Sequence, residues 1–187
     1  MPEKTVTRSF RINESAFLAL EEDAKKRNIS LNTLVNQLFM SYTNFDRYFQ
    51  RLGMLKMSKA AFRKILNAAP ANEIVEAAQD IAQNASRTII LARYGTLSLT
   101  GLLEFLNNFA DYAYFAERSE VVSPGEKRVL TFMHIYGEKG SIFIKAYVKS
   151  LFEQINVEPK LSSTENSHNR SFCKPIWEWE YGLKEYH

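Results

Sequence analysis

The stretch Thr5-Val-Thr-Arg-Ser-Phe-Arg-Ile12 decides the expected fold. It alternates with period two and is rich in β-branched and aromatic residues, a pattern typical of a β-strand. The alternation gives an apolar face and a polar face: Val6, Phe10 and Ile12, against Thr5, Thr7, Ser9 and Arg11. Arg8 falls on the apolar face. Since a register shift of one residue reverses every side chain, whether Arg8 or Arg11 points outward stays open.

Two helices are expected directly after this strand. Asn13 is a good N-cap and Glu14 suits the first turn, so a helix should run from there to about Arg27. Asn28 can adopt the left-handed conformation that ends a helix, and Ser30 can cap the next one. The apolar face of that second helix is Leu31, Leu34, Val35, Leu38, Phe39 and Tyr42.

The remainder of the chain mixes helices and strands. Helices are expected over 58–66, 72–93, 98–110 and 139–155, and strands over 113–122, 128–136, 157–162 and 170–176. The fold class is therefore α+β, with an N-terminal β-α-α unit before a mostly helical α/β domain that carries a small antiparallel sheet. The expected divisions are residues 1–52, 53–176 and a tail over 177–187.

Composition limits the kind of protein. The 187 residues carry 24 basic and 21 acidic side chains, a net charge of +3 that indicates nothing about nucleic acid by itself. Lys4, Arg8 and Arg11, however, gather near the N-terminus beside one acid, Glu3. The single cysteine, Cys173, excludes an internal disulfide framework. With no signal peptide and no apolar run near ~20 residues, a cytoplasmic protein without a membrane partner is expected.

A lone strand cannot satisfy its backbone groups, and two short helices offer too small a core. Two chains would solve both problems by pairing their strands and packing their helices together. The chain is therefore expected to form a homodimer or a higher oligomer. The side chains expected in the shared core are Val6, Phe10, Ile12, Phe17, Leu20, Leu34, Val35 and Leu38.

Residues 4–42, with Ser9-Phe-Arg-Ile-Asn-Glu14 and Asn28-Ile29-Ser30, resemble the ribbon-helix-helix family of Arc, MetJ and CopG repressors. The resemblance implies a homodimer that reads the major groove of double-stranded DNA with a two-stranded ribbon formed between chains. The implied base contacts are Thr7, Ser9 and Arg11. The start of the second helix would hold a phosphate. The expected phosphate contacts are Thr5, Arg8, Ser30, Leu31 and Asn32.

The expected function is sequence-specific regulation of transcription, in the first place repression. The domain from residue 53 would sense a small-molecule effector or build a higher assembly. Two alternatives stay open: an antitoxin-like protein whose C-terminal part binds a protein partner, and an architectural protein that coats DNA. A third reading makes residues 5–12 an edge strand of a single α+β domain.

Metal and catalytic chemistry are not expected. The spacing of His134, His168, Cys173 and His187 matches no metal motif, and no cofactor is implied. No nucleophile or acid–base motif is visible, so no catalytic residue is assigned and the chain is not expected to be an enzyme. His134 should be a hydrogen-bonded core residue. The aromatic residues Phe105, Phe109, Tyr112, Tyr114 and Phe115 indicate either core or an apolar ligand pocket.

Overall fold

A computed structural model describes residues 5–122, 127–157, 160–164 and 174–180. The chain divides into two compact parts, unit 1 (Met1–Arg47) and unit 2 (Tyr48–His187). The helices are α1 (Glu14–Lys26), α2 (Leu31–Ser41), the π-helical turn η1 (Tyr42–Asp46), α3 (Arg47–Arg51), α4 (Lys59–Ala68), α5 (Ala71–Ile81), the π-helical turn η2 (Ala82–Ser86), α6 (Arg87–Tyr94), α7 (Leu99–Ala113) and α8 (Gly137–Glu153). The strands are β1 (Glu117–Val122), β2 (Lys127–Met133), β3 (Lys160–Thr164) and β4 (Lys174–Glu180).

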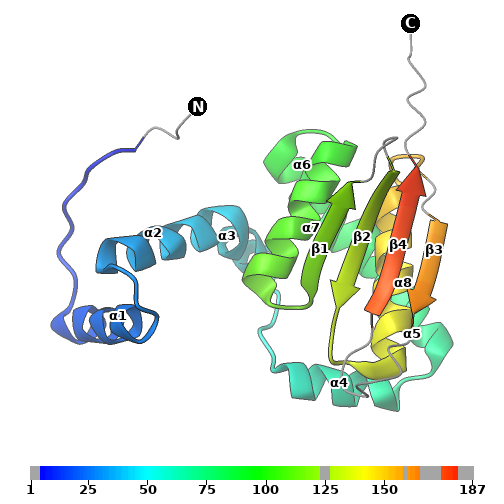
Figure 1. The fold of residues 1–187 in the computed structure, drawn as a ribbon, viewed down its shortest axis with the longest axis horizontal. Helices are drawn as coiled ribbons and strands as arrows, with labels where there is room; N and C mark the ends of the chain where they lie inside the picture. Colours follow the sequence, from blue (N-terminus) through cyan, green and yellow to red (C-terminus); the bar gives the residue numbers. More distant parts are fainter. Residues whose placement is uncertain (1–4, 123–126, 158–159, 165–173, 181–187) are drawn as a thin grey trace, which may run out of the picture. The chain divides into compact units, whose positions relative to one another are not determined.

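Unit 1 is a helical hairpin preceded by a non-helical segment (Figure 1). Asn13 occupies the N-cap position of α1, as predicted, although its side chain makes no capping hydrogen bond. Asn28 adopts a left-handed conformation with φ 53°, and the Ile29 amide donates back to the Ala24 carbonyl at 3.0 Å. This geometry ends α1 and turns the chain into α2. The predicted helix–turn–helix of residues 14–41 is therefore confirmed.

The fold class expected from the sequence is wrong in its first element. Residues 5–13 form no strand, unit 1 contains no ribbon, and the described chain is mostly helical. The physical reason is the lack of a pairing partner. A strand needs a neighbouring backbone for its N–H and C=O groups, and the strands described in this chain pair only with one another, all beyond residue 116. The ring of Phe10 instead lies edge-to-face against Phe39 of α2, with centroids 6.0 Å apart.

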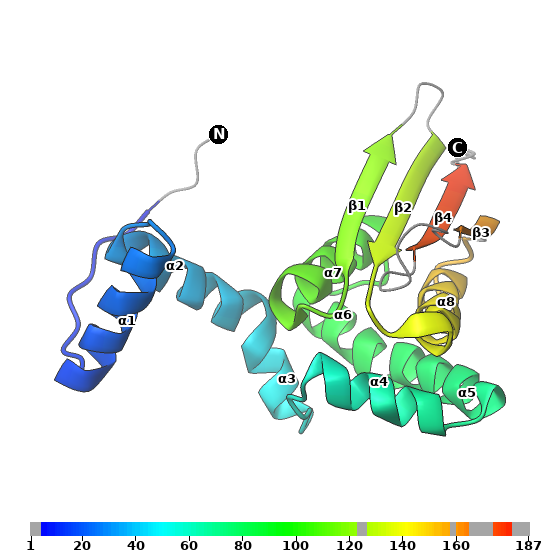
Figure 2. The same ribbon diagram turned by 60° about the horizontal axis from the view of Figure 1, so that its bottom comes forward.

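Unit 2 contains a four-stranded antiparallel sheet in the order β1-β2-β4-β3 (Figures 1 and 2). The last strand, β4, lies between β2 and β3, so that β3 is at the edge of the sheet. In the backbone register, Leu130 of β2 is opposite Trp177 of β4. Because β4 covers Lys174–Glu180, the expected tail from residue 177 begins inside a strand instead.

The helices of unit 2 cover one face of this sheet, with α7 and α8 closest to it (Figure 2). Helix α8 also packs along α5, and its Phe143, Tyr147, Leu151 and Phe152 are buried. Helices α4 and α7 begin where they were predicted to begin, at Ser58 and Ser98, and each of these hydroxyls caps its helix by accepting from the amide three residues on. Within the described residues no single helix is long and apolar enough to cross a membrane; Ala71–Tyr94 and α7 pass that test only as a pair bent by 112°.

Candidate nucleic-acid interface

The basic N-terminal segment lies open to solvent. Every residue from Thr5 to Asn13 is exposed, including all those predicted to face DNA bases: Thr7, Ser9 and Arg11. Arg8 and Arg11 make no ion pair with any residue that the structure describes; the guanidinium of Arg8 only donates to the Thr7 carbonyl at 3.5 Å. By contrast, Lys25 and Lys26 of α1 pair with Glu21 and Glu22 one turn earlier. The positive charges of Arg8 and Arg11 are therefore available to bind an anion, whereas those of Lys25 and Lys26 are already paired with glutamates.

The start of α2 has the features of an anion-binding helix end. The Ser30 hydroxyl accepts from the Thr33 amide at 3.0 Å and is 2.7 Å from the Thr33 hydroxyl. The amides of Leu31 and Asn32 have no partner inside the helix because they belong to its first turn. That turn contains no acidic residue to compete with a bound anion. A phosphate could accept from these amides at the positive end of the helix dipole.

Apolar side chains are the second feature of unit 1. Among its residues from Thr5 onward, only Ala24, Leu34 and Phe45 are buried apolar side chains. The exposed fraction is 70% for both Val6 and Phe10, and about half for Leu38 and Phe39. The exposed apolar set of unit 1 is Val6, Phe10, Ile12, Phe17, Leu18, Leu38, Phe39 and Tyr42.

The predicted dimer core thus separates into two groups. Leu34 is already buried between the helices of its own chain, and Val35 is half-buried. Val6, Phe10, Ile12 and Leu38 are uncovered. Leu18, exposed by 55%, was missed in the sequence because it lies one residue from Phe17 and off the face that contains Leu20 and Ala24.

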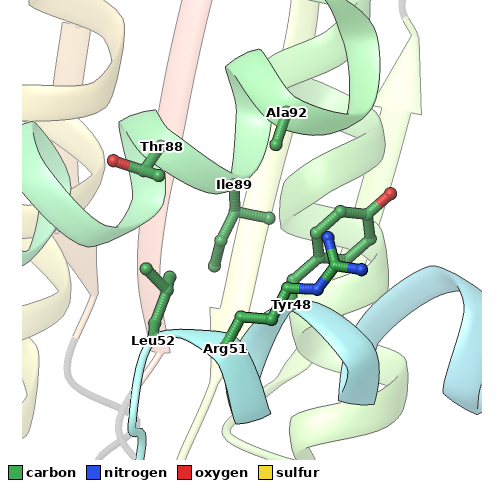
Figure 3. Close-up of a pocket in the computed structure, with 6 residues that line it drawn as sticks. All are labelled: Tyr48, Arg51, Leu52, Thr88, Ile89 and Ala92. Atoms are coloured by element: carbon green, nitrogen blue, oxygen red, sulfur yellow. The ribbon is translucent and has the colours of Figure 1, made fainter.

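A second candidate site is a pocket in unit 2 between the C-terminal part of α3 and α6 (Figure 3). Its walls are Tyr48, Arg51, Leu52, Thr88, Ile89 and Ala92. Its volume is about 80 Å³, whereas pockets for drug-sized ligands measure about 300–1,000 Å³. The pocket therefore gives no support to a sizeable effector, and the effector stays a prediction from the sequence.

His134 is a buried core residue, as predicted. Its Nδ1 accepts from the Tyr136 amide at 3.2 Å, and its Nε2 lies 3.2 Å from the Ser141 hydroxyl. Burial lowers the pKa of His134 to about 4, so the ring is neutral near pH 7. The other candidate metal ligands, His168, Cys173 and His187, lie outside the described residues.

The aromatic cluster predicted as core or pocket is core for most of its members. Phe105 is buried, and Phe109 and Phe115 pack against each other with centroids 5.3 Å apart, whereas Tyr114 is exposed. The Tyr136 hydroxyl donates to the Phe115 carbonyl at 2.7 Å, and burial raises the pKa of Tyr136 to about 12. These rings fill space between α4, α7 and α8.

Within the described residues, no three His, Cys, Asp or Glu side chains gather to hold a metal ion. The geometry of unit 1, an open basic segment beside an uncovered apolar surface, is thus the arrangement with the clearest chemical use. No protein-family model matches the chain, and no curated protein matches it.

Proposed function

We propose that the chain is a sequence-specific regulator of transcription that binds double-stranded DNA as a homodimer through unit 1. The observation that carries the proposal is the exposed apolar set of unit 1, which lies next to a basic segment without described ion-pair partners. A 47-residue unit whose described part buries three apolar side chains has too little core to be stable alone. A second copy of the same surface is the simplest cover, since most oligomers of identical chains pair one surface with itself.

The energy available from such pairing is sufficient. Complete burial of a Val, Leu, Ile or Phe side chain contributes about 1.5–3 kcal/mol. If five half-exposed side chains of the exposed apolar set on each of two chains become buried, this burial contributes roughly 10 kcal/mol. Association costs an estimated 4–15 kcal/mol in lost freedom of motion. The two terms are comparable, so a dimer is expected once the packing of helices between the two chains is added.

Dimerisation would also bring two exposed N-terminal segments, one from each chain, to the same duplex. In the major groove, Arg11 could bond guanine with two hydrogen bonds, and Thr7 and Ser9 could bond several base edges. The amides at Leu31 and Asn32, with Ser30, would hold a backbone phosphate and fix the orientation.

The experiment that tests DNA reading is selection of bound sequences from a random pool of duplexes, using the full chain. We expect an enriched motif with two-fold symmetry. Tight binding to duplexes without enrichment of any sequence would indicate an architectural protein that coats DNA instead of a sequence-specific regulator. Absence of binding to any duplex would leave the antitoxin-like alternative and overturn the proposal.

Dimerisation is tested by one substitution and a matched control. Leu38 is exposed in the single chain, so Leu38→Asp breaks no buried contact within that chain and should weaken the dimer at least tenfold, as measured by analytical ultracentrifugation. Leu91, on α6 of unit 2, is also an exposed leucine. The variant Leu91→Asp should dimerise like the wild type. Equal dimer affinity for both variants would refute the assigned surface.

A further inference from the structure

One stretch of the chain contains basic residues and no acid. Between Asp46 and Glu73 every charged side chain is positive, and the set is Arg47, Arg51, Lys56, Lys59, Arg63 and Lys64. The stretch covers α3, the connection to α4, and α4 itself. It lies outside the segment at residues 5–12 that is proposed to read bases. Such local accumulation of one charge is the footprint of a polyanion site.

Three of these cations belong to α4 and are open to solvent. Lys59, Arg63 and Lys64 are exposed. Among the residues that the structure describes, none of the three has an ion-pair partner. Lys59 and Arg63 are one turn apart, about 6 Å along the helix axis. This contrasts with α1, whose lysines are neutralised by glutamates on the same helix.

Helix α4 is held firmly in place by its other face. Phe62 packs edge-to-face on Tyr136 and Phe143, with centroids 5.2 and 5.6 Å away, and Leu66 is buried. At the C-terminal end, Lys139 of α8 donates from Nζ to the carbonyls of Asn67, at 2.9 Å, and Ala69. The cations therefore project from a fixed support.

We propose that Lys59, Arg63 and Lys64 form a second DNA contact, which binds phosphates of the duplex backbone without reading sequence. This inference rests on the proposed function of unit 1 for its choice of duplex DNA. Its role is to add affinity, because each neutralised phosphate releases condensed counterions. Base selection stays with the N-terminal segment.

An anionic membrane surface is the competing occupant, since exposed Leu55 and Met57 lie just before α4. Peripheral helices that bind membranes bury an apolar face between the lipids. The apolar face of α4, Phe62 and Leu66, is already used by the core of unit 2. Ile65 is the one large apolar side chain exposed on this helix. Because its apolar face is already packed, α4 has little apolar surface to bury in a bilayer, and this favours a phosphate backbone.

The test compares two double variants in the full chain. Arg63→Gln/Lys64→Gln removes two cations from α4, and Lys145→Gln/Lys149→Gln removes two from α8, where Lys149 pairs with Glu153 at 3.6 Å. Affinities for an enriched duplex and a random duplex are measured from 50 to 200 mM KCl. Log affinity falls as log salt rises, and we expect the α4 variant to make this fall shallower by roughly 1.8 slope units, on both duplexes. The α8 variant should keep the wild-type slope.

Failures of the two proposals are distinguishable. A wild-type slope in the α4 variant, with sequence preference intact, overturns the second contact alone. Loss of slope on a random duplex, with no preference for any sequence, supports the second contact and refutes base reading by unit 1. Vesicles of phosphatidylserine provide the other arm. Binding to them that depends on Arg63 and Lys64, together with an unchanged DNA slope, would assign the cations to a membrane.

Discussion

Protonation of the buried His134 is expected to destabilise unit 2 in acid. The neutral ring accepts from the Tyr136 amide through Nδ1, so Nε2 carries the proton and donates to the Ser141 hydroxyl. Adding a proton to Nδ1 would place two donors face to face. It would also charge a ring that is only 3% exposed. Folding therefore disfavours the charged form.

The size of the effect follows from the pKa difference between the two states. The pKa is about 4 in the folded chain, against 6.5 for an unperturbed histidine. At 1.36 kcal/mol per unit of pKa, the neutral ring contributes about 3 kcal/mol. Between these values the unfolded chain binds more protons, so stability falls as the pH decreases. The contribution is complete above about pH 6.5 and is lost as the pH approaches 4.

The assay is urea unfolding between pH 7.5 and pH 4.5, followed by tryptophan fluorescence. Both tryptophans, Trp177 and Trp179, belong to β4, so the signal reports unit 2. The control His134→Gln cannot titrate at this position and should lose less stability over the same range. The other histidines cancel in the difference between the two proteins. Identical pH dependence of wild type and variant would refute the reasoning.

Three further predictions concern Tyr147, Gly140 and Arg11. Tyr147→Phe leaves the buried Ser86 hydroxyl without its 2.6 Å partner and should cost about 1–3 kcal/mol in urea unfolding, part of which a second change, Ser86→Ala, restores. Gly140→Ala places a Cβ against the Cβ of Tyr136 and should destabilise unit 2 by about 1–3 kcal/mol or more, whereas Gly101→Ala, which meets a ring atom at 3.2 Å, should cost less. Arg11→Ala should reduce affinity for the enriched duplex in a binding titration while the dimer persists, and unchanged affinity would remove Arg11 from the base contacts.

Local signals in the sequence located much of the helical framework. Ser30 was predicted as a cap, and helices were predicted to begin at Ser58 and Ser98; each of the three hydroxyls accepts from the amide three residues later. Asn28 was predicted to end α1 and has the required positive φ. Such features depend on a few neighbouring residues, and the side chain itself supplies the hydrogen bond or the conformation.

Features that depend on distant partners were not predictable in the same way. The alternation of residues 5–12 was sufficient to suggest a strand, but a strand also requires a neighbouring backbone that this chain does not bring to it. The insertion of β4 between β2 and β3 likewise has no local signal. The cations of α4 were missed for another reason. Charge summed over residues 52–122 is balanced, because acids of α5 such as Glu73 and Glu76 offset them.

The central claim, that unit 1 binds duplex DNA as a dimer, is tested most directly by the composition of the complex. The mass of the wild-type chain on its enriched duplex should be measured by analytical ultracentrifugation, beside that of Leu38→Asp. The account predicts two chains, or a multiple of two, on a symmetric site, and loss of that complex in Leu38→Asp at concentrations where Leu91→Asp still forms it. A single chain bound at full affinity, with Leu38→Asp binding equally well, would contradict it.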